Sequence, residues 1–211
     1  MVGAPRTGII ILGGGGHASV VADALRVAGD NVLGFTDRTP GGDWLPGNIK
    51  CLGTDDVIAG YEPGSVRLAL GIGSVRPSPE RMKLFEEYRG RGYRFVTVIH
   101  PSAVIAGDAE LGEGAQIMAG AIVQPGCKIG EGTIINTRAS IDHDCRIGRF
   151  VHVAPGATLS GCVTLGDGCH IGVGAVVVQQ VTIGAHAFVA ASSLVKSDIS
   201  SNAKIGNSGI V

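Results

Sequence analysis

The sequence predicts two structural units: an α/β unit with a parallel sheet over residues 1–100, and a left-handed parallel β-helix over residues 101–211. Two observations lead to this prediction. Residues 8–37 have the pattern of a strand, a glycine-rich turn, a helix and a second strand. From Ile105 to Val195, every sixth residue is Ile, Leu or Val. The first pattern is typical of a Rossmann-like sheet, and the second of coils with three six-residue faces.

The composition excludes several classes of protein. The formal net charge of -1 gives no reason to expect binding to nucleic acid or to an anionic membrane surface. No apolar stretch reaches the roughly 18 residues of a membrane span, and the apolar run near the N-terminus is too short for a signal peptide. The five cysteines have no CxxC pair, which favours reduced, buried thiols. We therefore expect a cytoplasmic protein.

The first glycine-rich turn follows an apolar strand at residues 8–12. It contains Gly13, Gly14, Gly15, Gly16 and His17, and it precedes a helix that ends at Gly29 and a second strand that ends at Asp37. The N–H groups of such a turn, together with a helix N-terminus, suit a phosphate group. The alternative is an ordinary tight turn in which His17 caps the helix.

A second glycine-rich turn follows a predicted strand over residues 66–74 and contains Gly71, Ile72, Gly73 and Ser74. Between the two turns we expect a loop across which Trp44 packs. After the second turn we expect a helix that starts at Ser78–Glu80 and a last strand over residues 95–99. Both turns should lie at one edge of a parallel sheet, where ligands bind.

The β-helix has a second period of eighteen residues. An aliphatic residue followed by glycine recurs at Gly112, Gly130, Gly148, Gly166 and Gly184, and we expect these glycines to allow corners with unusual backbone angles.

Because coils stack about 4.8 Å apart, this period places Gly161 on His143 and His170 on His152. It also places Asp144 between Gly126 and Cys162.

His143 is the candidate general base. It lies between Asp142 and Asp144, and a neutral histidine accepts a proton from an attacking amine more readily when a carboxylate raises its basicity. The alternative is a solvated surface residue. His152 is either a hydrogen-bond donor to a ligand or a surface residue, whereas His170 and His186 read as surface histidines. We expect no metal, because no two histidines are a few residues apart on one coil.

These segments resemble the bacterial nucleotide-4-aminosugar N-acetyltransferases, which also resemble sialic-acid O-acetyltransferases. The matching segments are IIILGGGGHASVV, LGIGS followed by a helix, VIHPSA, INTRASIDHDCRIG and VHVAPGATLSG. Members that act on GDP-perosamine are especially similar around GGGGHA and DHDCRIG. The C-terminal SSNAKIGNSGIV lacks the proline that is usual in the family tail.

The resemblance implies transfer of an acetyl group from acetyl-coenzyme A to the 4-amino group of a nucleotide-linked 4-amino-4,6-dideoxysugar, in a homotrimer with sites between adjacent β-helices. The implied base is His143, with Asp144 tuning it, Asn136 placing the amine and the Gly161 N–H stabilising the oxyanion. The implied acetyl-coenzyme A contacts are His152, Gly161, Val173 and Ala191. The implied nucleotide-sugar contacts are Gly14, Gly15, Gly16 and His17 at the phosphates, Asp37 at the base or ribose, and Gly73.

Three points stay open at this level. The nucleotide is GDP or UDP, and the stereochemistry of the sugar is not determined. A sialic-acid-type sugar O-acetyltransferase is an alternative enzyme. A non-catalytic trimeric scaffold that binds sugar nucleotides is an alternative of another class, and the intact set of His143, Asn136 and Gly161 argues against it.

Overall fold

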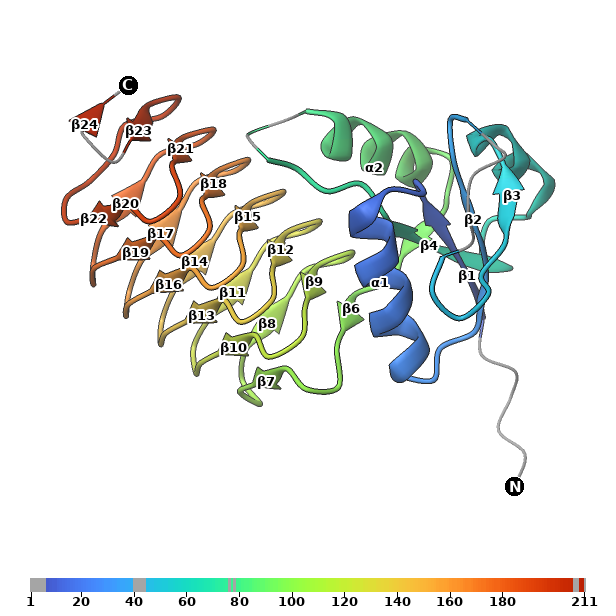
Figure 1. The fold of residues 1–211 in the computed structure, drawn as a ribbon, viewed down its shortest axis with the longest axis horizontal. Coiled ribbons are helices and arrows are strands. Elements are labelled where there is room, and N and C mark those ends of the chain that lie inside the picture. The colour runs from blue at the N-terminus through green and yellow to red at the C-terminus, as the bar shows by residue number, and fades with distance from the viewer. Residues whose placement is uncertain (1–6, 40–44, 76, 78, 207–208, 211) are drawn as a thin grey trace.

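The computed structural model describes residues 7–39, 45–75, 77, 79–206 and 209–210, so Trp44 and Ser78 lie outside the described residues. It contains a parallel-sheet α/β unit followed by a parallel β-helix, as the sequence predicts (Figure 1). The left-handed winding stays a prediction. No helix among the described residues is both long and apolar enough to cross a membrane.

The α/β unit is built on one five-stranded sheet with the order β3-β2-β1-β4-β5. The strands are β1 (Gly8–Leu12), β2 (Val32–Thr36), β3 (Cys51–Gly53), β4 (Val66–Leu70) and β5 (Arg94–Phe95). The helices are α1 (Gly16–Val27), α2 (Glu80–Gly90) and the 3-10 helix η1 (Asp55–Gly60). Alternate residues of β1 face opposite layers. Ile9 and Ile11 pack with α1, and Ile10 and Leu12 pack with α2.

The first glycine-rich turn follows the central strand β1, and the second follows its neighbour β4. The chain leaves β1 toward β2 on one side and leaves β4 toward β5 on the other, so the strand order reverses between β1 and β4. Such a switch point is where open parallel sheets bind ligands. The expectation that both turns share one edge of the sheet is therefore confirmed.

The expected single strand over residues 95–99 is instead two short strands in different sheets. Arg94 and Phe95 pair with β4, whereas β6 (Val98–Ile99) pairs with β9 of the β-helix. The chain passes from one unit to the other between Phe95 and Val98. The division at residue 100 itself stays a prediction.

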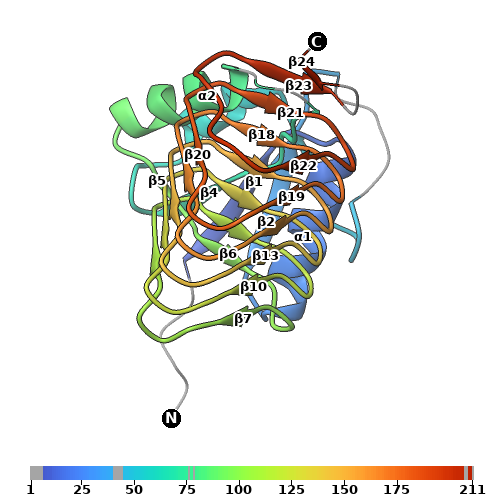
Figure 2. The ribbon, with the colours of Figure 1, turned by 90° about the vertical axis from the view of Figure 1, so that its left-hand side faces the viewer.

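The β-helix has three parallel faces (Figures 1 and 2). Face 1 contains β6, β9 (Gln116–Ile117), β12 (Ile134–Ile135), β15 (His152–Val153), β18 (His170–Ile171), β21 (Phe188–Val189), β23 (Lys204–Gly206) and the antiparallel β24 (Gly209–Ile210). Face 2 contains β7 (Val104–Ile105), β10 (Ile122–Val123), β13 (Ser140–Ile141), β16 (Thr158–Leu159), β19 (Val176–Val177) and β22 (Leu194–Val195). Face 3 contains β8 (Glu110–Leu111), β11 (Lys128–Ile129), β14 (Arg146–Ile147), β17 (Thr164–Leu165) and β20 (Thr182–Ile183).

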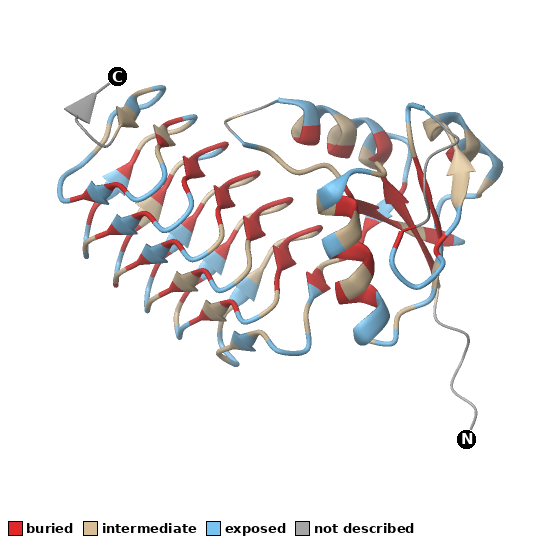
Figure 3. Cartoon of the chain, in the orientation of Figure 1, coloured by how far each residue is buried: buried red, intermediate tan, exposed pale blue. Residues whose placement is uncertain are grey.

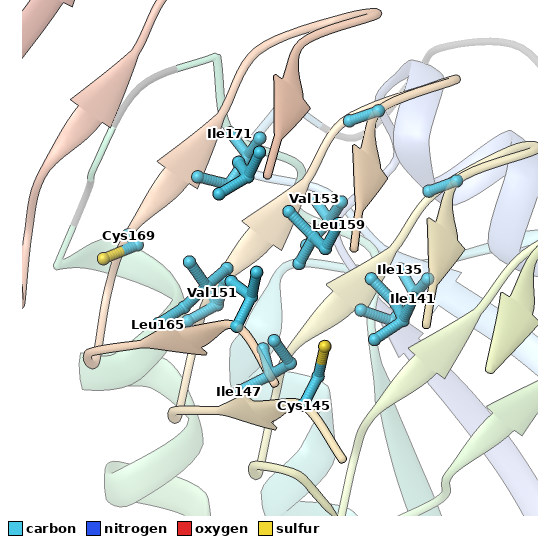
Figure 4. Close-up of a cluster of buried hydrophobic side chains, with 14 of the residues drawn as sticks. Ile135, Ile141, Cys145, Ile147, Val151, Val153, Leu159, Leu165, Cys169 and Ile171 are labelled. Atoms are coloured by element: carbon cyan, nitrogen blue, oxygen red, sulfur yellow. The ribbon is translucent and has the colours of Figure 1, made fainter. Parts of the chain in front are cut away.

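The second residue of each short strand from β7 to β22 is one of the aliphatic residues found at every sixth position. These side chains fill the interior, where nearly all of them are buried (Figure 3). Figure 4 shows Ile135, Ile141, Ile147, Val153 and Leu159 meeting inside the coils. The period of six therefore sets the core, as predicted.

The corners correct one expectation. The glycines that recur every eighteen residues do not have left-handed backbone angles. A Cβ added at Gly130 would instead lie 2.5 Å from the backbone of Gly148 in the next coil. Left-handed angles occur elsewhere, for example at Gly126, Asp144 and Cys162, where φ is 72°, 59° and 60°. The recurring glycines are thus required by the close approach of stacked coils.

Candidate active site

A cavity of about 650 Å³ lies where the two glycine-rich turns meet face 1 of the β-helix and the edge between faces 1 and 2. The lining residues are Gly13, Gly15, Gly16, His17, Val20, Gly71, Ile72, Gly73, Ser74, Val75, Asn136, Thr137, His152 and Pro155. We call it the main cavity because predicted site residues line it, whereas none of them lines a larger cavity of about 860 Å³ bounded by Met82, Phe150 and Phe188. It brings together Gly15, Gly16, His17, Gly73, Asn136 and His152 of the predicted site residues.

The N-terminus of α1 opens into the main cavity. Gly15 is the N-cap residue, no side chain caps the helix, and the first turn has no acidic residue. A Cβ added at Gly15 or Gly16 would meet no atom within 4 Å. The N–H groups at this helix end therefore have open space in front of them. They also form the positive end of the helix dipole, which suits a phosphate group.

A second cavity of about 390 Å³ shares Gly13 and Ile72 with the main cavity and is lined by Asp37. Gly14 lies against this carboxylate, because a Cβ added at Gly14 would be 2.4 Å from Asp37 Oδ2. Glycine at position 14 thus leaves room for Asp37 at the end of β2. The two adjoining cavities have room for an elongated ligand.

His17 is held as a neutral ring. Gln116 donates its amide N–H to the Leu70 carbonyl at 2.7 Å, so its Oε1 faces His17 Nε2 at 2.8 Å and accepts a hydrogen bond from the Nε2–H of His17. Nδ1 of His17 consequently has a free lone pair. Burial and the nearby Arg81 lower the pKa of His17 to about 4. The side chain therefore offers an acceptor, so only the backbone N–H of His17 could donate to a phosphate.

His152 connects the second glycine-rich turn to Asn136. It is 7% exposed, its Nδ1 donates to the Ser74 carbonyl at 2.8 Å, and its Nε2 accepts from Asn136 Nδ2 at 3.0 Å. Burial lowers the pKa of His152 to about 3. Asn136 Oδ1 accepts from the Thr137 N–H, so the orientation of the Asn136 amide is fixed. One amide hydrogen of Asn136 is left for a ligand.

His170 is not a surface residue as predicted. It is 5% exposed, and its ring lies between those of His152 and Phe188 on face 1, with centroid distances of 5.0 and 5.4 Å. His186 is exposed, as expected. The second turn and α2 contact face 1 at His152 and Gln116. The outward residues of face 1 are more apolar than Glu110, Lys128 and Arg146 of face 3.

His143 lies on the edge between faces 2 and 3, and its side chain is 57% exposed. Its Nδ1 is 2.9 Å from Asp144 Oδ2, and its backbone N–H donates to Asp142 at 2.8 Å. The hydrogen bond to Asp144 raises the pKa of His143. The left-handed backbone at Asp144 turns this carboxylate back toward the ring, which settles which aspartate pairs with it.

Gly161 lies against His143, as the stacking rule predicts. A Cβ added at Gly161 would be 2.5 Å from His143 Nε2. No hydrogen bond from the Gly161 N–H to another of the described residues is found. An imidazole nitrogen and a backbone donor that has no partner among the described residues therefore lie side by side at this edge.

The predicted site residues form separate groups. His143, Asp144 and Gly161 lie on the edge between faces 2 and 3, while the main cavity lies on face 1 and the edge between faces 1 and 2. Val173 and Ala191 lie further along that second edge, on later coils. One chain thus does not bring its candidate base to its own cavity.

Some site features were not predicted. Gln116 and Arg81 are buried polar residues behind the main cavity, and only their position on covered surfaces would have indicated them. All five cysteines are free, and Cys162 is exposed rather than buried. Cys162, His143 and Asp144 place potential metal-ligand atoms within 4.8 Å of one another. The absence of a metal stays a prediction.

Comparisons with known proteins support the two-unit fold. Residues 8–87 match the PglD N-terminal domain, and residues 108–141 and 126–161 match the bacterial transferase hexapeptide (six repeats). UDP-N-acetylbacillosamine N-acetyltransferase of Bacillus subtilis (strain 168) is 37% identical over 119 residues, which are 53% of this chain and 51% of that protein. The chain thus spans about half the length of the curated relative it matches.

Solved structures match over nearly the whole chain. A histidine-to-asparagine mutant of perosamine N-acetyltransferase from Caulobacter crescentus, in complex with CoA and GDP-perosamine, is 35% identical with a TM-score of 0.88, covering 100% of this chain and 98% of that one. The acetyltransferase domain of PglB from Neisseria gonorrhoeae FA1090, in complex with acetyl coenzyme A, is 30% identical with a TM-score of 0.90, covering 98% of each chain. The chain therefore belongs to the family of hexapeptide-repeat sugar N-acetyltransferases that begin with a PglD N-terminal domain.

Proposed function

We propose that the protein transfers an acetyl group from acetyl-coenzyme A to the 4-amino group of a nucleotide-linked 4-amino-4,6-dideoxysugar, with His143 as general base. The observation that supports this most is the pairing of His143 with Asp144 directly against Gly161. Relatives in the same family bind CoA with GDP-perosamine, or acetyl coenzyme A. No metal takes part in the proposed reaction.

In the proposed mechanism, the sugar amine attacks the thioester carbonyl directly. His143 Nδ1–H donates to Asp144, so Nε2 is free to take the amine proton as the N–C bond forms. The carbonyl oxygen becomes an oxyanion, which accepts a hydrogen bond from the Gly161 N–H. The intermediate then expels the coenzyme A thiolate, which takes the proton back from the imidazolium. Asp144 makes Nε2 more basic and stabilises that imidazolium.

The two cavities suit the nucleotide-sugar. We place the diphosphate at the N-terminus of α1, the nucleoside beside Asp37 in the second cavity, and the sugar toward Asn136 in the main cavity. Asn136 would present its remaining amide hydrogen to the substrate. Val173 and Ala191, along the edge between faces 1 and 2, would contact acetyl-coenzyme A together with His152 and Gly161. Acetyl-coenzyme A chemistry and five free thiols suit the cytoplasm.

We also propose that the working enzyme is a homotrimer. His143 and the main cavity lie on different edges of one β-helix, so a complete site needs His143 from one copy and the cavity from its neighbour. Mixing refolded His143→Ala chains with refolded Asn136→Ala chains tests this, since some mixed interfaces would carry neither substitution. Activity regained on mixing supports shared sites. Activity that stays at the level of the single variants contradicts them.

The reaction is tested by release of free coenzyme A thiol from acetyl-coenzyme A. The acceptors are GDP-perosamine, a UDP-linked 4-amino-4,6-dideoxysugar and sialic acid, and the same sugars without nucleotide are controls. We expect release with one nucleotide-linked amino sugar and not with its free sugar, which also identifies the nucleotide. Release with sialic acid alone would make the protein an O-acetyltransferase. Nucleotide-sugar binding without any thiol release would favour the non-catalytic scaffold.

A further inference from the structure

Arg81 lies at the junction between the two structural units. It is the second residue of α2, and it is 3% exposed. Its Nη2 donates to the Gly132 carbonyl at 2.9 Å, and its Nη1 donates to the Ile72 carbonyl. Arg81 thus ties the second glycine-rich turn to a corner of the β-helix.

The charge of Arg81 has no carboxylate partner among the described residues. Acidic residues are close in sequence on both elements that it joins, but they pair with other arginines at the surface. Glu86 of α2 pairs with Arg89 and Arg149, and Glu131, next to Gly132, pairs with the same two arginines. Burial lowers the pKa of Arg81 to about 9, so it is still protonated at neutral pH. A buried, unpaired charge is normally avoided because of its desolvation cost.

This charge lies directly behind the wall of the main cavity. Ile72, whose carbonyl it binds, lines both cavities. Gln116 Oε1 lies 3.5 Å from Arg81 Nη2 and 2.8 Å from the cavity residue His17. The charge contributes to the lowered pKa of His17 and of His152. Its positive potential therefore reaches the cavity, on the same side as the N-terminus of α1.

We propose that Arg81 is a positioning residue whose fixed positive charge, behind the wall of the main cavity, selects for a diphosphate-linked ligand. This inference rests on the proposed function. The bound diphosphate supplies the counter-charge that the chain itself does not, and Arg81 also holds the Ile72–Gly73 turn against it. A sugar without a diphosphate would leave the charge uncompensated and would bind less well.

The test compares two variants by calorimetric binding of GDP, UDP, guanosine and uridine. Arg81→Met removes the charge and Arg81→Lys keeps it. We expect Arg81→Met to weaken the affinity for the nucleoside diphosphate that binds the wild type about tenfold, or about 1.4 kcal/mol. The affinity for the matching nucleoside should change by less than about twofold. Arg81→Lys should recover most of the loss. Arg94→Met, which removes an exposed positive charge, is the control and should leave both affinities unchanged.

Other outcomes are separable. Equal weakening of diphosphate and nucleoside would show that Arg81 is only a structural clamp, and unchanged diphosphate affinity would also overturn the proposal. If Arg81→Met does not fold, Arg81→Gln keeps a donor for one carbonyl without the charge, and the same comparison applies. Binding is measured without turnover. A wild-type protein that binds a diphosphate but releases no thiol would refute the proposed reaction and leave this inference standing.

Discussion

The substitution Gly161→Ala should lower the rate of catalysis without unfolding the protein. The new Cβ would lie 2.5 Å from His143 Nε2 and 2.6 Å from Cε1, where ordinary contacts are about 3.5 Å. The ring must therefore move by about 1 Å, which disturbs its 2.9 Å hydrogen bond to Asp144. A 1 Å misplacement of a reacting group costs about 10²-fold in rate, or about 2.7 kcal/mol.

The same substitution should cost little stability. The backbone at Gly161 is not left-handed, so alanine fits it, and the displaced ring is 57% exposed and free to swing outward. The assay is thiol release with a saturating acceptor, together with a thermal melt. Gly107→Ala is the matched control, because a Cβ there meets no atom within 4 Å. A folded Gly161→Ala protein with wild-type turnover would refute the reasoning, and so would one that loses activity only by unfolding.

Three further predictions concern basicity, acid stability and coil stacking. Asp144→Asn removes the group that raises the pKa of His143, so the lower inflection of the pH–rate profile should move to lower pH, with a reduced plateau; an unmoved inflection would exclude Asp144 as the tuning group. His152 and His170 have pKa values lowered by burial to about 3 and about 4, so the unfolded state binds more protons below about pH 6.5 and stability falls as the pH drops. Each of these two histidines should lower the free energy of unfolding by up to about 1.4 kcal/mol per pH unit between about pH 6.5 and its folded pKa. Replacing His170 with Phe should therefore make the free energy of unfolding, measured by denaturant titration at several pH values, depend less steeply on pH. Gly130→Ala places a Cβ 2.5 Å from the backbone of Gly148, which cannot swing away, so the free energy of unfolding should fall by about 1–3 kcal/mol while Gly107→Ala stays neutral.

The β-helix could be predicted almost residue by residue, because its core repeats with a fixed period. The aliphatic residue at every sixth position from Ile105 to Val195 is the second residue of a strand, and the eighteen-residue period by itself predicts that Gly161 lies on His143. The period also locates the recurring glycines, but it does not give the reason for them. The period shows where a residue lies, whereas a backbone approach such as that of Gly130 to Gly148 depends on three-dimensional spacing.

The parts that could not be predicted arise between the two units. The sequence suggests that His170 is a surface residue, because the six-residue period shows which residues point outward but not which outward residues are buried by other parts of the chain. Gln116 and Arg81 act at a junction between segments that are distant in sequence: Arg81 contacts Gln116 and Gly132, which are 35 and 51 positions away. The separation of His143 from the main cavity also depends on which edge of a triangular coil each residue occupies. The period of six assigns each residue to an edge, but it does not show which face the α/β unit contacts. The position of the main cavity relative to His143 therefore could not be predicted.

The most direct test of the account is thiol release by His143→Ala with the nucleotide-linked amino sugar that the wild type accepts. The account predicts turnover reduced by about 10²–10⁴-fold. The melting temperature should not change, because the His143 side chain is 57% exposed in the chain. Nucleotide affinity should not change either, because we place the nucleotide at Asp37 and the N-terminus of α1. A folded His143→Ala protein that acetylates the sugar at the wild-type rate would contradict it.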